Sequence, residues 1–336
     1  MKNHPVSESL VSRRDFVSRL ALAGAALPLA GSAAYAQAEG AKKKAAPAGP
    51  TSGTGKVGAL HVFSKPLHFL SYEDTAKMIA EAGFGGIDYT VRKGGHVLPE
   101  KVKEDLPRAV EAAKKAGLKV EMITTDIVSA KDPLTEPLLR TAAGLGVKVY
   151  RFGNFAYDEK LGVMGSLAKH RTTIKELGAL NQSLGIHGAI QNHAGTRVGA
   201  ALWDLYEILR ESDPKWTGVQ YDIRHAVAEG GQSWSVPLKL LAPWIKCIDL
   251  KDFKWEQLPG KANIDNVPIG EGIVPFDAYF KLVRELGING PASVHFEYPP
   301  FERAQIPEAE KRPKLLAAMK KDLAALKPHL AKHQLG

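Results

Sequence analysis

The sequence predicts a single-domain α/β protein of the (β/α)8 TIM-barrel class over residues 57–330, and three observations support this fold. Short apolar segments alternate with amphipathic ones from Val57 onward, as in α/β proteins with a parallel sheet. Eight such apolar segments occur, which is the number of strands that closes a barrel. The alternating region is about 275 residues long, the size of one such barrel.

The eight expected strands share short length and apolar character. They are 57–63, 86–91, 118–124, 147–152, 186–192, 217–222, 244–250 and 291–297. Helices are expected between them, for example over 72–82, 101–116 and 201–211, and several end at a glycine, as at Gly83, Gly117 and Gly287. An open doubly wound sheet is the alternative, but no Gly-x-Gly-x-x-Gly turn follows the first strand, which disfavours its nucleotide-binding form.

Composition excludes several classes of protein. The chain has 336 residues, of which 44% are hydrophobic and 24% charged, as in ordinary globular proteins. A single cysteine, Cys247, excludes an internal disulfide and a Cys-rich zinc site, and its place deep in a strand predicts a buried, unreactive thiol. More than half of the net charge of +9 comes from the first 56 residues, so no nucleic-acid partner is expected.

The N-terminus has the pattern of an export signal. Arg13 and Arg14 precede an aromatic residue, a mild apolar run over 20–30 and the small-residue segment 34–36. The run is too short for a membrane span, so no stable membrane anchor is expected. Paired arginines predict a twin-arginine signal over 1–36 and a periplasmic or otherwise exported protein, against the alternative of a cytoplasmic amphipathic helix. Residues 37–56 are rich in Ala, Lys, Pro and Gly and predict a flexible linker.

Polar side chains recur at the ends of the last four expected strands. Counted by twos along each strand, they form four pairs: Gln191 and His193, Gln220 and Asp222, Asp249 and Lys251, and His295 and Glu297. Any one pair can be a hydrogen-bonded core residue and its neighbour. Because the working residues of TIM barrels lie at the carboxyl ends of strands, the four together predict one functional site.

The same residues suggest a metal site. Gln191, Asp222, Asp249 and Glu297 offer oxygen ligands, which suit Mn²⁺, Mg²⁺ or Ca²⁺ better than Zn²⁺. The nearby histidines, His193, His225 and His295, can add nitrogen ligands or transfer protons. We therefore expect a divalent cofactor, with Mn²⁺ or Mg²⁺ favoured.

A second group of residues predicts the substrate end of the site. Asp88, Thr90 and Arg92 share a face at the end of the second strand and precede a glycine-containing loop that ends at His96, although that loop also fits an ordinary surface turn. Arg151 ends the fourth strand and offers a fork of donors to hydroxyls or a carboxylate. Aromatic residues beyond the strand ends, namely Trp234, Trp255, Tyr298 and Phe301, can stack on a sugar or pack in loops. We expect Arg92, His96, Arg151, Trp255 and His225 to bind substrate.

These motifs resemble the xylose isomerase-like TIM barrels, a superfamily of sugar isomerases and epimerases that also contains endonuclease IV. The resemblance covers about 57–330 and rests on Ile190-Gln191-Asn192-His193, Tyr221-Asp222-Ile223-Arg224-His225, Asp249-Leu250-Lys251-Asp252, Gly270-Glu271-Gly272 and His295-Phe296-Glu297. In the family's keto-sugar epimerases, Glu, Asp, His and Glu hold the metal, and a histidine three residues after the Asp contacts substrate. Asp222, His225 and Glu297 match this pattern.

Two positions depart from the family pattern. Gln191 replaces the usual Glu, and Asp249 replaces the usual His of a His-x-Lys-Asp motif. A neutral amide cannot act as a base, so the epimerase mechanism with one carboxylate on each side of an enediolate is incomplete. Glu297 is the expected base, His193 or His225 the expected acid, and Lys251 a further expected catalytic residue.

The leading hypothesis is an exported, metal-dependent sugar isomerase or epimerase that abstracts a proton next to a carbonyl. Elimination from, or hydration of, a 3-keto-glycoside is the alternative that Gln191 suggests. A non-catalytic carbohydrate-binding barrel with a degenerate metal site is another, and a nucleic-acid lesion enzyme is disfavoured by export. Export also favours an unphosphorylated carbohydrate partner, and the oligomeric state stays open.

Overall fold

The computed structural model describes residues 54–302 and 306–336, except for the side chain of Lys261. The expected export signal, and all of the expected linker except its end, lie outside the described residues. The first strand begins at Lys56.

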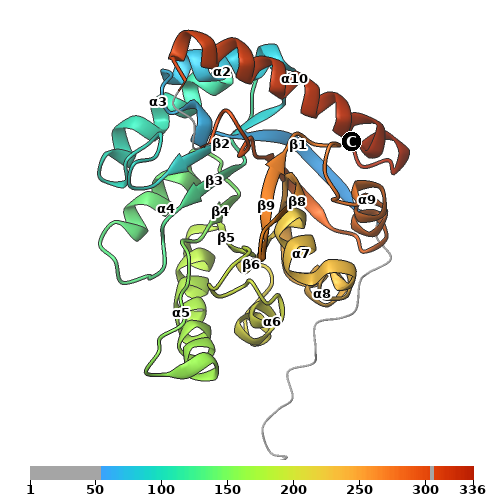
Figure 1. Ribbon diagram of the computed structural model, residues 1–336. Coiled ribbons are helices and arrows are strands. Elements are labelled where there is room, and N and C mark those ends of the chain that lie inside the picture. Colours follow the sequence, from blue (N-terminus) through green and yellow to red (C-terminus); the bar gives the residue numbers. More distant parts are fainter. Residues whose placement is uncertain (1–53, 303–305) are drawn as a thin grey trace, which may run out of the picture. The chain divides into compact units, whose positions relative to one another are not determined.

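Eight parallel strands close into a barrel, which confirms the predicted fold class (Figure 1). Around the barrel they follow the order β1-β10-β7-β6-β5-β4-β3-β2, so each strand pairs with its neighbours in the chain once the inserted β8 and β9 are set aside. The strands are β1 (Lys56–Phe63), β2 (Gly86–Val91), β3 (Met122–Thr125), β4 (Val149–Arg151), β5 (His187–Gln191), β6 (Thr217–Asp222), β7 (Ile245–Leu250) and β10 (Asn289–Val294).

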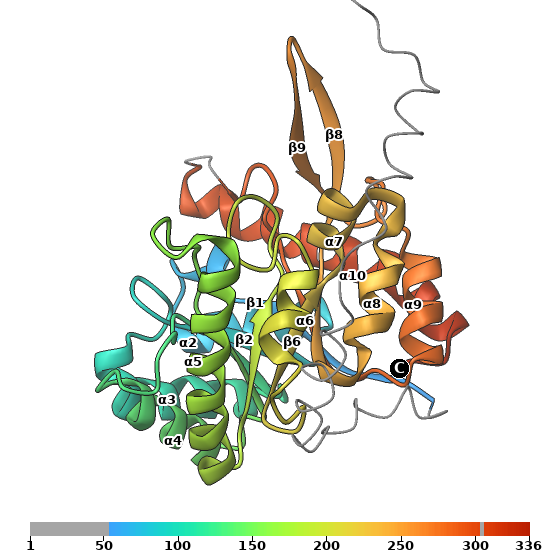
Figure 2. The ribbon, with the colours of Figure 1, turned by 90° about the horizontal axis from the view of Figure 1, so that it is seen from below.

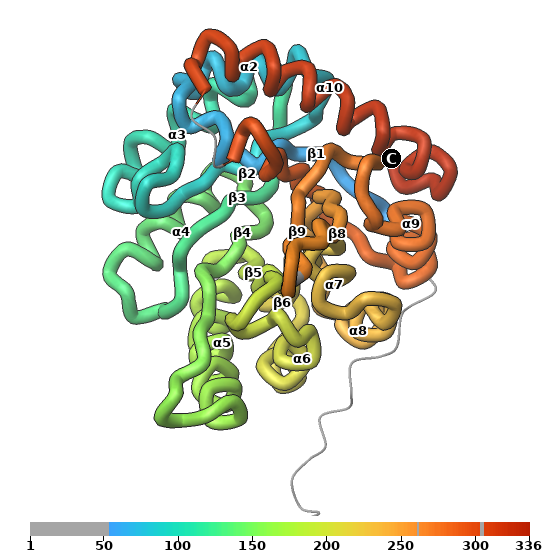
Figure 3. The backbone as a smooth tube through the Cα atoms, viewed as in Figure 1, coloured from blue at the N-terminus to red at the C-terminus, as the bar shows by residue number. Residues whose placement is uncertain are grey.

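Helices surround the barrel and cover the outer face of its strands (Figure 1). They are α2 (Tyr72–Ala82), α3 (Val102–Lys115), α4 (Thr135–Gly144), α5 (Gly162–Leu184), α6 (Trp203–Leu209), α7 (Ile223–Gly230), α8 (Ser235–Leu241), α9 (Phe276–Glu285) and α10 (Glu308–Lys332). The tube in Figure 3 shows α10, from the end of the chain, lying along α2. None of the helices in the described ranges combines the length and apolar run that a membrane crossing demands.

Local sequence explains where α2 begins and ends. The Ser71 hydroxyl accepts a hydrogen bond from the Asp74 amide at 3.0 Å and caps the helix. Gly83 ends it with a φ of 87°, a conformation that costs glycine little. The predicted range 72–82 is therefore confirmed to the residue.

Other predicted elements differ from the structure at their ends. β3 begins at Met122 rather than Leu118, and β10 ends at Val294, so His295 and Glu297 follow the strand instead of lying in it. The largest difference is a two-stranded hairpin, β8 (Asp252–Leu258) and β9 (Lys261–Val267), which stands out from the barrel in Figure 2. Its strands are rich in charged residues that face water, so they lack the apolar run by which the barrel strands were found.

The barrel interior is apolar at one level and polar above it. Met122, Val149, Ala189 and Cys247 form a small buried cluster. Cys247 is buried, as predicted, and burial raises the pKa of its thiol well above the ordinary value. One step of two residues further along β7, the same inward face carries Asp249, so the polar layer begins directly above this cluster.

The carboxylate of Asp252 holds together the loop that follows the hairpin. It accepts hydrogen bonds from the backbone amides of Phe253, Gly270, Gly272 and Val274, at 2.9–3.1 Å. A Cβ atom on Gly272 would lie 2.1 Å from this carboxylate, so the close approach requires glycine. The Asp252 and Gly-Glu-Gly motifs are thus one structural unit.

We predict that Asp252→Ala lowers the free energy of unfolding by on the order of 4 kcal/mol, because four amides lose a charged acceptor. Denaturant unfolding followed by circular dichroism measures this loss. Glu271→Ala is the matched control, since Glu271 lies in the same loop and, among the described residues, its side chain is hydrogen-bonded only by Lys321. Equal midpoints for the two variants would contradict the assignment.

Asp322 of α10 is a buried carboxyl away from the barrel mouth. It accepts hydrogen bonds from the Tyr298 hydroxyl at 3.1 Å and the Ile269 amide at 3.3 Å. Burial, which outweighs these two hydrogen bonds, raises the pKa of Asp322 to about 7. The folded state therefore holds the proton more tightly than the unfolded state, and the stability linked to it is lost as the pH rises toward 7.

We predict that Asp322→Asn flattens this pH dependence. Between pH 5 and pH 8 the wild-type protein loses about 3 kcal/mol of unfolding free energy that the variant keeps, because the amide does not ionise. Denaturant midpoints across this pH range test the prediction. Asp265→Asn, at a partly exposed hairpin residue, should follow the wild-type curve, and an Asp322→Asn curve parallel to it would refute the linkage.

Candidate functional site

Asp222 and His225 are joined by the start of a helix. Asp222 ends β6 and is the N-cap of α7, where its Oδ1 accepts a hydrogen bond from the His225 amide at 3.2 Å. Because the histidine follows the acid by three residues, this bond fixes the position of the His225 backbone relative to the Asp222 carboxylate. The other oxygen, Oδ2, points into the barrel mouth and is free to make tertiary contacts.

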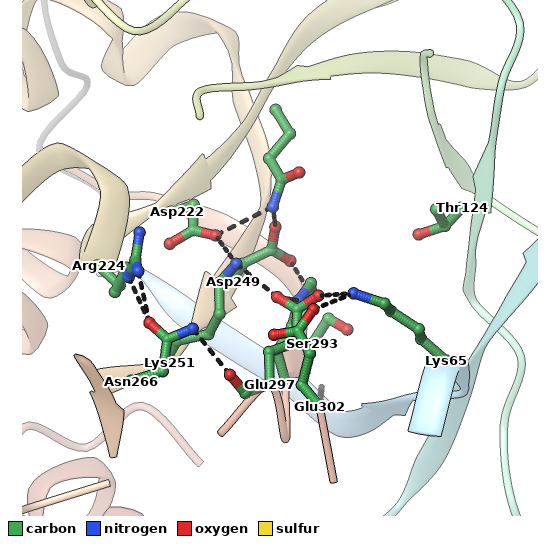
Figure 4. A network of polar contacts seen from close by, with 12 residues as sticks. Lys65, Thr124, Asp222, Arg224, Asp249, Lys251, Asn266, Ser293, Glu297 and Glu302 are labelled. Carbon is green, nitrogen blue, oxygen red and sulfur yellow. Dashed lines mark hydrogen bonds and ion pairs between the residues drawn. The ribbon is translucent and has the colours of Figure 1, made fainter. Parts of the chain in front are cut away.

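The ammonium of Lys251 lies at the centre of the site (Figure 4). Its Nζ is 2.9 Å from Asp222 Oδ2, 3.0 Å from Glu297 Oε2 and 3.0 Å from His225 Nε2. Burial alone would lower the pKa of Lys251, but the charges of Asp222 and Glu297 outweigh it and raise the pKa above the ordinary value. Lys251 is therefore a buried cation between two carboxylates.

Glu297 is held by a lysine at each oxygen. Lys65 Nζ lies 2.8 Å from Oε1, and Lys251 Nζ lies 3.0 Å from Oε2. Lys65 also bridges to Glu302 at 2.6 Å. Burial opposes ionisation, but Lys251 and then His295 and Lys65 lower the pKa of Glu297 well below its usual range. Glu297 is accordingly an ionised carboxylate and a weak base.

The side-chain amide of Gln191 has one possible orientation. Arg151 Nη1 donates to its oxygen at 2.8 Å, so the amide nitrogen faces the acids. That nitrogen donates to Asp222 Oδ2 at 3.0 Å and to Asp249 Oδ2 at 2.6 Å. A reversed amide would place its oxygen against two carboxylates and its N–H groups against a guanidinium. Gln191 therefore acts as a donor toward the site.

Asp249 is fully buried and surrounded by donors. Its Oδ1 accepts from Gln220 Nε2 at 2.7 Å and lies 3.3 Å from His295 Nε2, and its Oδ2 accepts from Gln191. Burial would raise the pKa of Asp249, but the adjacent His295 lowers it, and the same pairing raises the pKa of His295. These two residues form a buried ion pair beneath the site.

His193 and His225 lie face to face, with ring centroids 4.0 Å apart. The pKa of each is lowered, for His193 mainly by burial and for His225 by burial and then by Lys251, so both rings are neutral near pH 7. His193 Nδ1 lies 2.8 Å from the Ala194 carbonyl, which can only accept, so this nitrogen carries the proton. Nε2 of His193 is thus left with a lone pair.

A cavity of about 380 Å³ opens beside this cluster, a volume typical of small-molecule sites. His193, Arg224 and Glu297 line it from the barrel. The hairpin lines the other side through residues of β9, including Ile264 and Asn266. The hairpin that sequence patterns missed is therefore part of the site.

The expected substrate-binding residues Arg92, Arg151, His96 and Trp255 do not share one environment. The guanidinium carbons of Arg92 and Arg151 are 5.8 and 5.6 Å from the centre of the Phe63 ring, and no ion pair to either arginine is found among the described residues. His96 donates from Nε2 to the Leu70 carbonyl at 3.1 Å and does not line the cavity. Trp255 is 42% exposed on β8, where it pairs in register with Ile264.

Asp88 and Thr90 support the barrel instead of facing the cavity. The carboxyl of Asp88 accepts from the hydroxyls of Thr124 at 3.1 Å and Ser293 at 2.8 Å, and burial raises its pKa to about 6. Thr90 exchanges hydrogen bonds with Ser64 and His68. Of the other aromatic residues beyond strand ends, Trp234, Tyr298 and Phe301 are buried in packing.

Two residues of the site escaped the sequence analysis. Lys65 follows the first strand by two positions and could have been found by applying the strand-end rule to every strand. Asn266 had no such signal because its strand was not recognised. Its oxygen accepts from Arg224 Nε at 3.0 Å, and its nitrogen donates to the Glu297 carbonyl at 2.7 Å. Asn266 therefore ties the hairpin to the barrel.

The closed parallel barrel, with its polar residues gathered at the carboxyl ends of the strands, defines a TIM barrel of the kind that carries active sites. Residues 76–327 match the family described as xylose isomerase-like TIM barrel, and the chain belongs to this family. No curated protein matches the chain.

Three solved structures share the fold. The IOLI protein, whose structure holds a zinc atom, has a TM-score of 0.65 and 17% identity over 81% of this chain and 99% of its own. The 3-keto-D-glucoside 4-epimerase YcjR from E. coli has a TM-score of 0.57 and 14% identity over 77% and 98%. The probable 3-DHS dehydratase AsbF from Bacillus anthracis has a TM-score of 0.55 and 18% identity over 79% and 97%.

The arrangement of these side chains does not fit the divalent metal that the family resemblance implies. The oxygen of Gln191, expected as a ligand, accepts from Arg151, and its nitrogen faces the carboxylates. Asp222 and Glu297 both bind Lys251 at hydrogen-bond distances. Within the described residues, no group of three or more His, Cys, Asp or Glu side chains is arranged to hold a metal ion.

We predict that Asn266→Ala releases the hairpin from the barrel. Amide hydrogen exchange across 252–267 should accelerate on the order of 100-fold, because the links to Arg224 and Glu297 are lost and each is a hydrogen bond worth about 1.5 kcal/mol. Mass spectrometry of exchanged peptides measures this. Asn263→Ala is the control, because within 54–302 and 306–336 the Asn263 side chain hydrogen-bonds only to Glu256, on the hairpin itself. Identical exchange in both variants would show that Asn266 is not the link.

Proposed function

We propose that the protein is an exported, isomerase-type enzyme that removes a proton from the carbon next to a sugar carbonyl. The observation that carries this proposal is that His193 and Glu297 line the same cavity in complementary states. His193 is a neutral imidazole with a lone pair at Nε2, and Glu297 is an ionised carboxylate fixed by two lysines. Such a pair can abstract a proton and hold a polyhydroxylated substrate.

In this proposal His193 is the base and Glu297 orients the substrate. The expectation that Glu297 is the base is less well supported, because Lys65 and Lys251 each engage one of its oxygens and lower its basicity. Its carboxylate can still accept hydrogen bonds from sugar hydroxyls. His193 would take the proton from carbon, and the electron pair would move onto the carbonyl oxygen to form an enediolate.

The protonation states favour a one-base path. At rest neither His193 nor Glu297 carries a proton to deliver from the opposite face, so the proton that His193 takes is the one it returns. Returned to the neighbouring carbon, while the hydroxyl proton passes from one enediolate oxygen to the other, it completes an isomerisation. Epimerisation with two carboxylates is disfavoured, since Gln191 stands where the second would act.

Elimination from a keto-glycoside is the second candidate. Here the protonated His193 would give its proton to the departing oxygen, which one group acting first as base and then as acid can achieve. The locked amide of Gln191 favours this outcome, because a single base suffices. The fold neighbours include a 3-keto-D-glucoside epimerase and a probable dehydratase, which supports both candidates.

The proposed substrate is an unphosphorylated sugar or glycoside, oxidised to carry a carbonyl group. Arg92 and Arg151, whose guanidinium groups both lie near the Phe63 ring without ion pairs among the described residues, would bind oxygen atoms of such a sugar. Trp255 pairs in register with Ile264, which lines the cavity, and its exposed ring would stack on a sugar. A twin-arginine signal would deliver the folded enzyme to the periplasm, where phosphosugars are scarce.

We predict that the purified protein, incubated with ketohexoses and with 3-keto-glycosides in D₂O, exchanges or transfers the proton next to the carbonyl. His193→Gln should lower the rate at least about 100-fold, whereas Glu297→Gln should mainly raise KM. The wild-type rate should fall on acidification through a pKa below about 6.5, as His193 becomes protonated. NMR of the recovered sugar measures all three effects.

The products separate the two candidates. Conversion to an isomer with an intact skeleton, or deuterium in the recovered sugar, indicates isomerisation, and release of the aglycone indicates elimination. His170→Gln, at a histidine of α5 bonded to the Ala156 carbonyl, is the matched control and should retain the wild-type rate. Finding no isomer, no exchange and no release of aglycone with these ketohexoses and 3-keto-glycosides would refute the proposed function.

A further inference from the structure

We propose that the ammonium group of Lys251 is the resident cation of this site and takes the place of a divalent metal. The proposal concerns what holds the site together. It stands on the geometry of the cluster and does not depend on which reaction the site catalyses.

The first support is where Nζ lies. It contacts an oxygen of Asp222, an oxygen of Glu297 and a ring nitrogen of His225, at 2.9, 3.0 and 3.0 Å. These are the three residues that match the family's metal and substrate positions. Hydrogen-bond lengths of this kind exceed the 2.0–2.6 Å over which Mg²⁺ and Ca²⁺ hold oxygen ligands. Figure 4 shows the lysine side chain reaching between the two acids.

The second support is the direction of the Gln191 amide. Its nitrogen donates to Asp222 and Asp249, and Arg151 fixes its oxygen on the other side. A metal ligand at this position must present an electron pair, and this residue presents hydrogens. The substitution of Gln for the usual Glu thus removes a metal ligand and adds a hydrogen-bond donor to Asp222 and Asp249, the acids around the lysine.

The third support is the balance of charge. The carboxylates of Asp222 and Glu297 face the ammonium groups of Lys251 and Lys65, and Asp249 accepts hydrogen bonds from the amides of Gln191 and Gln220. A divalent ion added to this cluster would meet positive charges at close range without gaining a free carboxylate. The cluster is complete with the cations that the chain itself provides.

Lys251 therefore acts as a positioning residue. It comes from the end of β7 and ties Asp222, at the end of β6, to Glu297, which follows β10. It thereby fixes the carboxylate that lines the cavity. The site is assembled when the barrel closes and needs no separate loading step.

Metal content and thermal unfolding of the full chain test the proposal. We expect wild-type protein purified without chelators to hold less than about 0.1 equivalent of Mn, Mg, Zn or Ca by mass spectrometry. Its melting temperature should be the same with EDTA, with 1 mM Mn²⁺ and with 1 mM Mg²⁺, because a metal that does not bind the folded protein cannot stabilise it. About one metal per chain, together with a fall in melting temperature on adding EDTA, would overturn the proposal.

Lys251→Ala tests the role of the ammonium directly. It should lower the melting temperature well below that of Lys246→Met, a half-buried lysine at the other end of the same strand that serves as the control. Ethylammonium or Mn²⁺ at millimolar concentration should restore part of the loss in Lys251→Ala and have no effect on wild type or control. A Lys251→Ala variant as stable as Lys246→Met would overturn the proposal.

If Lys251→Ala does not fold, Lys251→Arg provides the second readout. Arg keeps the positive charge, so this variant should fold and stay insensitive to EDTA and Mn²⁺. A Lys251→Arg protein that binds Mn²⁺ at micromolar concentration would contradict the assignment. These readouts do not use turnover, so they separate failure of this proposal from failure of the proposed function.

Discussion

The contact of the Lys251 ammonium with the carboxylates of Asp222 and Glu297 is the constraint on which the site depends. Carboxylates buried in a barrel mouth are unstable unless each meets a cation or a hydrogen-bond donor. Here every acid of the cluster has such a partner within the chain. Removing any one of these partners would leave a buried charge unpaired, so the residues of the cluster depend on one another.

The barrel provides these partners because parallel strands bring their carboxyl ends to one rim. β6 and β7 pair in register so that Asp222 lies opposite Asp249, and the next inward position of the chain after β7 is Lys251. The cation thus comes from the strand next to the acid it neutralises. The apolar cluster around Cys247 closes the barrel below and keeps water from reaching the polar layer from that side.

The chemistry proposed for the site follows from the same electrostatics. Cations around Glu297 keep it ionised and make it a weak base, and the burial of His193 keeps that ring neutral. In the proposed mechanism, these surroundings make Glu297 the hydrogen-bond acceptor that binds substrate and His193 the imidazole that transfers a proton. The hairpin of β8 and β9 lines one side of the cavity. Because Asn266 donates to the Glu297 carbonyl, the position of the hairpin is coupled to that of Glu297.

The sequence alone determined the fold class, because the alternation of apolar strands and amphipathic helices admits few architectures. It also predicted that Gln191, Asp222, Asp249 and Glu297 lie together at one end of the barrel, because counting by twos along the expected strands gives them a common direction. Only the tertiary structure decided which contacts these side chains make. The direction of the Gln191 amide depends on Arg151 from another strand, and the partner of Lys251 depends on how β6, β7 and β10 meet. Such contacts join residues far apart in the chain, so local sequence patterns do not predict them.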